Sequence, residues 1–209
     1  TLYFAIFGID KWQILACVWA IIPLYNIYNF ATCPIERLVE DGQGMSLRQL
    51  LKKPIFAAAI ILMICAGASE MSMAQWASAF AESALGLTKS VGDLAGACLF
   101  ATTMGISRML YGKFGEKIDL IKFMLISGVI CVVSYLLAGL SAMPIWGLVG
   151  CVMCGFSVGI MWPGSISITA PRIPKGGTAL FALLAMAGDM GGAFGPSVVG
   201  YFSQHAGDN

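Results

Sequence analysis

The sequence predicts an all-α, polytopic transmembrane helical bundle, and three observations support this prediction. Hydrophobic residues make up 58% of the 209 residues and charged residues only 11%, whereas charged residues average roughly 25% of a soluble domain. The apolar residues gather in runs of about 20, the length at which a helix crosses the hydrocarbon core. There are also 25 glycines, and glycine is more frequent in membrane helices than in soluble ones.

Six stretches are long and apolar enough to be spanning helices. They do not alternate polar and apolar residues, which excludes spanning β-strands of about 10 residues. The opening residues 1–8 look like the tail of a further apolar helix, so we expect the chain to be a piece of a longer protein. The six predicted spans are 12–31, 55–80, 94–111, 120–140, 145–170 and 178–202.

The connections between the spans carry turn-forming residues, and one of them is long. Pro171 and Pro174 separate the fifth span from the sixth, because proline lacks the amide hydrogen that a continuous helix needs. Residues 33–53 are strongly polar, and their stretch MSLRQLL is expected to form a short amphipathic helix on the membrane surface. We therefore divide the chain into a first part, 1–32, a linker, 33–53, and a second bundle, 54–209.

The basic residues predict the orientation in the membrane. If successive connections alternate sides, one side receives only Lys11 and Lys89 of the 12 Lys and Arg residues. Cytoplasmic connections carry an excess of Lys and Arg, so the richer side is predicted to be cytoplasmic. It receives Arg37, Arg48, Lys52, Lys53, Arg108, Lys113, Lys117, Lys122, Arg172 and Lys175.

Composition and motifs argue against several function classes. A net charge of +1 provides no basic face for nucleic acid. Cys151 and Cys154 have the C-x-x-C spacing but lack further zinc ligands, and the single histidine, His205, leaves no metalloprotease motif or Ser-His-acid set. The glycine-rich stretch 188–195 lacks the Lys-Ser/Thr of a phosphate-binding loop. We expect no metal, no cofactor and no catalytic residues.

Glu70 is an ionisable residue in the apolar stretch AGASEMSMAQWASAF. A charge near the bilayer centre costs about 2.5–3.5 kcal/mol on insertion scales, so such a group is retained where it faces protein or water. Asp189 raises the same question near the centre of the last span. For both, two interpretations stay open: a carboxyl that binds substrate or carries a proton, or one that braces helices. Arg108 is the one basic residue within membrane depth, near the cytoplasmic end, so a partner outside this sequence is also open.

The surroundings of these two acids suggest further roles. The glycines around Asp189 form small-xxx-small pairs at 188/192 and 191/195, which allow close helix packing. Ser72, Gln75 and Trp76 share one helix face and offer a hydroxyl, an amide and a flat indole to a hydroxylated solute; interhelical packing is the alternative. The pair Trp162-Pro163 interrupts the fifth span, as broken helices at transporter sites do, although many membrane prolines are simply tolerated.

Three stretches make the chain resemble the major facilitator superfamily of secondary transporters. SRMLYGKFGEKIDLIK, residues 107–122, looks like a degenerate second-half copy of its loop signature: Gly112, Glu116 and Lys117 fit, and Asp119 departs from it. FGIDKWQILACVWA is similar to the start of the sixth helix. Residues 161–200 look like the tenth and eleventh helices of bacterial members, near the fucose-permease-like branch.

The resemblance implies helices six to eleven of a carrier with two six-helix halves, the remaining helices lying outside this sequence. It implies alternating-access transport of a small polar solute, a sugar or organic metabolite, across the bacterial inner membrane, with a proton as a candidate coupling ion. An intramembrane enzyme, a channel and a structural subunit are the alternatives. The expected solute or proton residues are Glu70, Ser72, Gln75, Trp76, Trp162 and Asp189. A conformational latch is expected from Arg108, Gly112, Glu116 and Lys117, unless these charges only set the topology.

Overall fold

The structure is a computed structural model that describes residues 12–34, 44–86, 88–141 and 143–206, and every regular element in these ranges is a helix. The chain divides into two compact units, Thr1–Asp41 and Gly42–Asn209, which are described separately. Six helical segments of the described residues are long and apolar enough to cross a membrane, which confirms the predicted number of spans.

The first unit contributes the helix α2, Trp12–Thr32, one residue longer than the predicted span. Its last turn is closed by the Thr32 hydroxyl, which donates to the Tyr28 carbonyl at 2.9 Å. None of the residues of α2 is buried within the structure. The predicted helix tail at residues 1–8 lies outside the described residues.

The second unit begins with the short helix α3, Leu47–Leu51, as the pattern MSLRQLL predicts. Ser46 and Gln49 form a capping box, in which each side chain accepts a hydrogen bond from the other residue's backbone amide. The Met45 amide donates to the Lys175 carbonyl at 2.8 Å, so the linker is bound to the connection between the last two spans. A position of α3 on the membrane surface stays a prediction.

The next three spans lie where the sequence predicts them, except that the third span begins five residues before its predicted start. Helix α4, Pro54–Leu85, extends five residues beyond the predicted end and stops at Gly86, whose φ of 62° favours glycine. The third span begins at Lys89, because α5, Lys89–Asp93, and a π-helical turn, Leu94–Cys98, lead directly into α6, Leu99–Phe114. Helix α7, Leu120–Leu140, has the predicted bounds.

The fifth span is interrupted, as the pair Trp162-Pro163 predicts. Helix α8, Pro144–Val158, ends one turn before the proline, and α9, Met161–Thr169, continues beyond it. Two short 3₁₀ turns, Ala170–Arg172 and Pro174–Gly176, then lead into the last span, α10, Gly177–Ala206.

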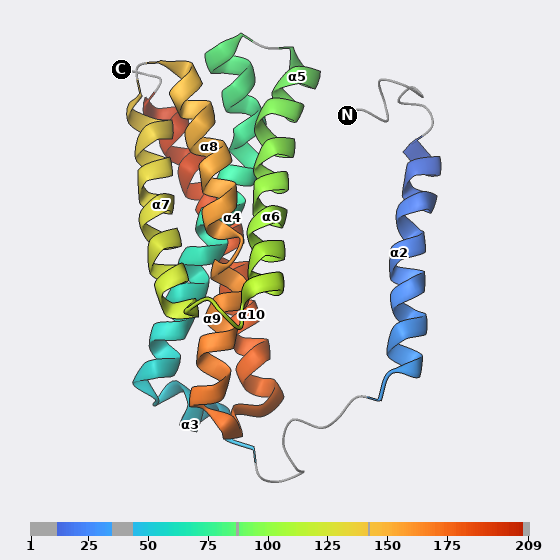
Figure 1. The fold of residues 1–209 in the computed structure, drawn as a ribbon. Helices are drawn as coiled ribbons and strands as arrows, with labels where there is room; N and C mark the ends of the chain where they lie inside the picture. Colours follow the sequence, from blue (N-terminus) through green and yellow to red (C-terminus); the bar gives the residue numbers. More distant parts are fainter. Residues whose placement is uncertain (1–11, 35–43, 87, 142, 207–209) are drawn as a thin grey trace. The chain divides into compact units, whose positions relative to one another are not determined.

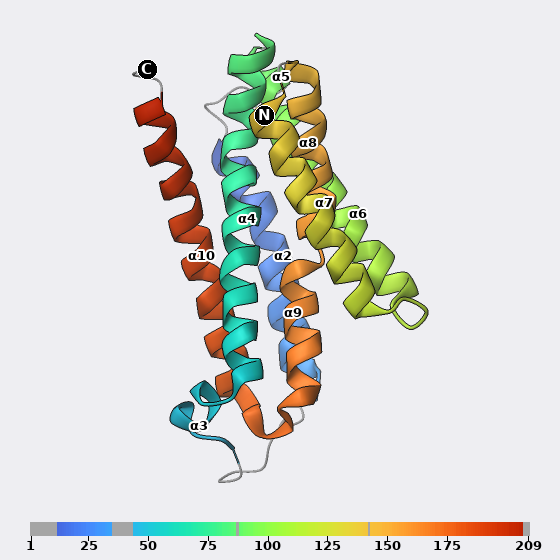
Figure 2. The same ribbon diagram turned by 90° about the vertical axis from the view of Figure 1, so that its left-hand side faces the viewer.

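The helices of the second unit lie side by side and alternate in direction (Figures 1 and 2). The α6–α7 and α9–α10 turns, which carry Lys117 and Lys175, lie toward the same end as α3. Most of the basic residues that were predicted to share one side therefore share one end of this unit. That this end is cytoplasmic stays a prediction.

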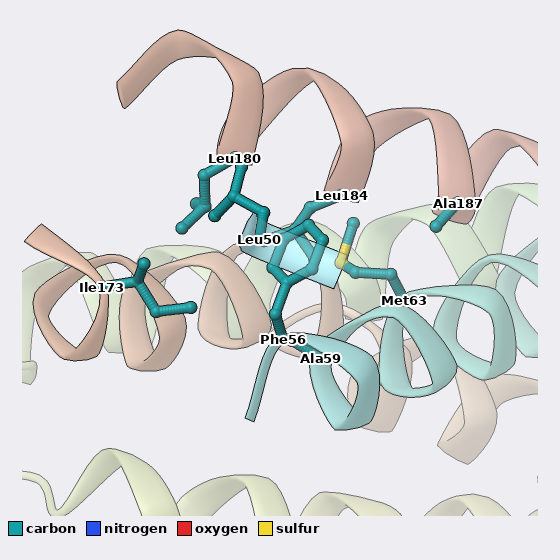
Figure 3. Packing of buried hydrophobic residues seen from close by; sticks show 8 residues of the cluster. All are labelled: Leu50, Phe56, Ala59, Met63, Ile173, Leu180, Leu184 and Ala187. Atoms are coloured by element: carbon teal, nitrogen blue, oxygen red, sulfur yellow. The ribbon is translucent and has the colours of Figure 1, made fainter. Parts of the chain in front are cut away.

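The core near α3 is apolar and joins the linker to the bundle (Figure 3). Phe56 and Met63 of α4 lie against Leu184 of α10, with Leu50 of α3 beside them. Burial of a Leu or Phe side chain stabilises a fold by about 1.5–3 kcal/mol where water is displaced. This cluster therefore holds the start of α4, next to Lys52 and Lys53, against α10.

Helices α4 and α10 share the largest interface between two helices, and glycines make it close. A Cβ on Gly67 would collide with the Gly188 carbonyl, and one on Gly191 with the Ile64 carbonyl. A Cβ on Gly195 would lie 2.8 Å from the Cα of Ala68. The small-xxx-small pairs predicted in the last span therefore pack on α4, which brings the spans carrying Glu70 and Asp189 together.

Candidate functional site

A pocket of about 330 Å³ lies among α4, α6, α9 and α10. It brings together Glu70, Trp162 and Asp189, which the sequence analysis selected separately. Arg108, which was assigned to the latch, lines the same space. The full lining, called the charged pocket below, is Gly67, Glu70, Met71, Arg108, Trp162, Gly188, Asp189 and Gly192.

Glu70 has a basic partner within this sequence. The Nη2 atom of Arg108 lies 3.6 Å from Oε1 of Glu70, and the two side chains are 45% and 18% exposed. Arg108 lies six residues before Phe114, the end of α6, which corresponds to about 9 Å along the helix. Because Arg108 is partly exposed, the pair is a moderate interaction rather than a fully buried one.

The same arginine binds the break in the fifth span. Pro163 has no amide hydrogen, so it cannot donate to the carbonyl four residues earlier, at Gly159. The Nε–H of Arg108 donates to that Gly159 oxygen at 3.0 Å. Pro163 therefore leaves the Gly159 carbonyl without its helical donor, and Arg108 donates to it instead.

Gly159 is also small enough to let α6 approach. A Cβ at this position would lie 2.7 Å from the Met104 carbonyl oxygen and 2.9 Å from Cβ of Ser107. Any larger residue would push α6 away from the break. The Thr103 hydroxyl, which donates to the Val152 carbonyl at 2.8 Å, joins the same two spans one turn farther along.

Trp162 and Asp189 form the opposite wall of the charged pocket. A Cβ on Gly188 would lie 2.7 Å from Cε2 of Trp162, so the indole rests on the bare backbone of α10 beside Asp189. Asp189 is exposed, and the described residues provide it with no ion pair. An indole face and a carboxylate next to an Arg–Glu pair can accept a solute with both polar and apolar groups.

Ser72, Gln75 and Trp76 lie outside the charged pocket. Ser72 is buried and lines a space between α4 and α7 with Tyr135, whose hydroxyl donates to the Ser69 carbonyl at 2.8 Å. Gln75 lines a groove between α4 and α10. Trp76 contributes to both spaces. Ser72 also lies against α10, where a Cβ on Gly195 would be 2.8 Å from its hydroxyl oxygen. All three residues of the predicted face therefore lie near α10, although they line different spaces.

The predicted latch residues lie at two levels of α6. Gly112 is in its last turn, and Glu116 and Lys117 are in the turn toward α7, whereas Arg108 binds Glu70 and Gly159 in this structure. A latch in another state of the protein stays a prediction.

Asp119, which departs from the loop signature, caps α7. Its carboxylate accepts hydrogen bonds from the Ile121 amide at 3.0 Å and the Lys122 amide at 3.3 Å. The Lys122 amide is the main cause that holds the pKa of Asp119 below its usual value, with a smaller contribution from the Ile121 amide. The departure therefore has a structural reason, since aspartate is a favoured N-cap residue.

The Glu70–Arg108 pair was not predicted from the sequence. The signal available was that Arg108 is the one basic residue within membrane depth, yet the loop signature assigned it to the cytoplasmic turn. Cys151 and Cys154 are buried in an apolar cluster with Cys131. Within the described residues, no group of three or more His, Cys, Asp or Glu residues is placed to hold a metal ion.

The chain matches the sequence profile of the Major Facilitator Superfamily over residues 4–207. Comparisons with curated proteins and with solved structures give no match. The matched family consists of multi-pass membrane proteins that carry out secondary transport of small-molecule solutes, and it is typically non-enzymatic. The match confirms the predicted all-helical membrane fold and the expectation of a transporter rather than an enzyme.

Proposed function

Because the chain belongs to the Major Facilitator Superfamily, we propose that it is part of a proton-coupled carrier of a small polar solute. The charged pocket is the proposed coupling site. The ion pair between Glu70 and Arg108, 3.6 Å apart, is the observation on which the proposal rests.

Protonation of Glu70 would release one side of Arg108. Two unit charges 4 Å apart attract by about 1 kcal/mol in water and about 4 kcal/mol at an effective dielectric constant near 20. Arg108 is 45% exposed, so the lower part of this range applies. Since about 1.4 kcal/mol is a tenfold change in an equilibrium constant, the proton can shift a two-state equilibrium appreciably.

Arg108 would transmit this change to the broken span. Its Nε–H stays on the Gly159 carbonyl, while its Nη groups are freed from Glu70. The guanidinium would then be available to solute or water in the pocket, and the α8–α9 break would be relieved of its link to α4. Alternating access requires such an element with two arrangements, each favoured by a different ligation state.

The finer parts of the proposal rest on the sequence resemblance. The six spans are assigned to positions six to eleven of the carrier, near the fucose-permease-like branch, in a bacterial inner-membrane symporter. Arg108, Gly112, Glu116 and Lys117 are retained as the proposed latch. Ser72, Gln75 and Trp76 are proposed to bind solute outside the charged pocket.

The test uses the complete transporter in proteoliposomes and a solute found by thermal-shift screening of sugars, organic acids and amines. Glu70→Gln keeps the shape of the side chain but holds it uncharged. Uptake driven by a pH gradient should fall at least tenfold, while exchange of labelled for unlabelled solute should continue. Glu82→Gln, on the same helix and hydrogen-bonded to Ser78 at 3.4 Å, is the matched control. Gradient-driven uptake that survives in Glu70→Gln would remove Glu70 from the coupling mechanism.

A further inference from the structure

A second polar space lies along the same pair of helices, farther from α3. It is a groove of about 500 Å³ between α4 and α10, lined by Gln75, Trp76, Ser197, Tyr201 and Gln204 among others. The two helices diverge toward this end of the unit (Figure 2). We call this space the α4–α10 groove.

The polar side chains that line the groove are uncharged. Gln75 and Gln204 each offer two N–H donors and a carbonyl acceptor. The Ser197 hydroxyl donates to the Ala193 carbonyl at 3.0 Å, which leaves its oxygen free to accept. Tyr201 also lines the groove and carries a phenolic hydroxyl. Because no acid or base among the described residues lines the groove, a charged solute would lose its hydration here without gaining a counter-charge.

Trp76 gives this groove a flat apolar wall. Its indole packs over Gly200 of α10, where a Cβ would lie 3.2 Å from Cζ2. The side chain is still 39% exposed, so one face remains open to a ligand. An indole face beside amide and hydroxyl groups suits a ring that has apolar C–H faces and hydroxyls at its edge.

The α4–α10 groove and the charged pocket share one lining residue. Gly192 lines both spaces, and a Cβ there would lie 2.9 Å from Cγ of Met71. The close packing of Gly67 on Gly188 lies just beyond this point on the α3 side. Gly192 therefore lies between the two spaces, and a side chain at this position would collide with Met71.

We propose that the α4–α10 groove is a subsite for an uncharged, hydroxyl-rich solute, a monosaccharide or polyol, which reaches the charged pocket past Gly192. This inference rests on the proposed carrier function and names its solute class. The two roles lie in different places: the uncharged groups of the α4–α10 groove bind the hydroxyls of the solute, and the Glu70–Arg108 pair of the charged pocket responds to the proton.

Thiol protection in the complete transporter tests the subsite. Ser197→Cys is introduced after the four exposed cysteines, Cys17, Cys33, Cys65 and Cys98, are replaced by serine. The new thiol should react with a membrane-impermeant methanethiosulfonate reagent. Neutral pentoses, hexoses and pentitols are then added singly, and at least one should slow the reaction at least fivefold, whereas amino acids and dicarboxylates should not. Val132→Cys, on the exposed face of α7, controls for access from lipid and should not react with the impermeant reagent.

Two variants separate this subsite from the coupling site. Gln75→Ala combined with Gln204→Ala should weaken protection by the sugar at least tenfold in concentration. Glu70→Gln should leave that protection unchanged even where it abolishes gradient-driven uptake. The subsite is refuted if the thiol at residue 197 does not react, if only charged solutes protect it, or if the double glutamine variant is protected normally. The coupling mechanism can fail in the uptake assay without affecting any of these results.

Discussion

The bond between Arg108 and the broken span predicts a specific energetic coupling to Pro163. Arg108→Lys keeps a positive charge for Glu70, but a single ammonium on a flexible stem does not replace a planar fork that binds two partners. The Gly159 carbonyl would lose the donor that now lies 3.0 Å away. A buried acceptor left unsatisfied costs about 1–3 kcal/mol. Because Arg108 is 45% exposed, we expect the lower half of that range.

Pro163→Ala should rescue this loss. Alanine restores the amide hydrogen that can donate to the Gly159 carbonyl within the helix, so the carbonyl no longer depends on Arg108. Residues 159 and 160 already have right-handed helical dihedral angles, and little rearrangement is needed. Arg108→Lys should therefore cost about 1–1.5 kcal/mol in the native background and close to zero in Pro163→Ala.

The assay is a double-mutant cycle on the complete transporter in detergent, with the free energy of unfolding measured by denaturant titration. Thr103→Ser, which keeps the neighbouring hydroxyl bond to Val152, is a control that should be additive with Pro163→Ala. If Arg108→Lys costs the same amount in both backgrounds, the Gly159 carbonyl does not depend on Arg108, and the reasoning is refuted.

Three further predictions concern packing and capping. Gly67→Ala should destabilise the complete transporter by about 1–3 kcal/mol through overpacking between α4 and α10. Gly128→Ala, with no atom within 4 Å of the added carbon, is the control and should not destabilise it. Equal free energies of unfolding for the two variants would contradict this packing. Gly188→Ala should displace the indole of Trp162 and change its fluorescence, and a spectrum equal to that of the parent would exclude the contact. Asp119→Ala should lower thermal stability by removing the cap of α7. Because the pKa of Asp119 is lowered in the folded protein, the difference in thermal stability between the parent and Asp119→Ala should be full above about pH 4 and should shrink as the pH falls further. A stability difference that grows in acid would contradict the cap.

The spans could be predicted from sequence because the membrane imposes a length and a polarity on each of them. Helix α7 has the predicted bounds because Asp119 marks its start and Ser141 follows its end. The predicted third span starts five residues late, at residue 94, because the prediction leaves Lys89 in a connection. Asp93 in fact accepts a hydrogen bond from Ser78 of α4, so a charged residue can lie in a helix when a neighbouring helix satisfies it.

The pairing of Glu70 with Arg108 could not be predicted with the same certainty, because it depends on how far one helix slides along another. A sequence fixes the depth of each residue only within a few residues of the span ends. Here Gly159 lets α6 approach the break. Pro163 leaves the Gly159 carbonyl without its helical donor, and Arg108 binds that carbonyl, which fixes the position of Arg108 along the span. The relevant signals were a glycine and a proline four residues apart in another span, and only the packed structure shows that they act on α6.

The predicted face of Ser72, Gln75 and Trp76 shows why helix periodicity identifies neighbours on a helix but not what they face. Helix α4 contacts α10 on one side and α8 on another, with Tyr135 of α7 reaching it near Ser72. All three residues nevertheless lie near α10: a Cβ on Gly195 would be 2.8 Å from the Ser72 hydroxyl oxygen, and one on Gly200 would be 3.2 Å from Cζ2 of Trp76. They line different spaces, because Ser72 and Trp76 also reach the space beside Tyr135, whereas Gln75 does not. Gln75 joins Ser197, Tyr201 and Gln204 of α10, three residues that no pattern within α4 could have indicated.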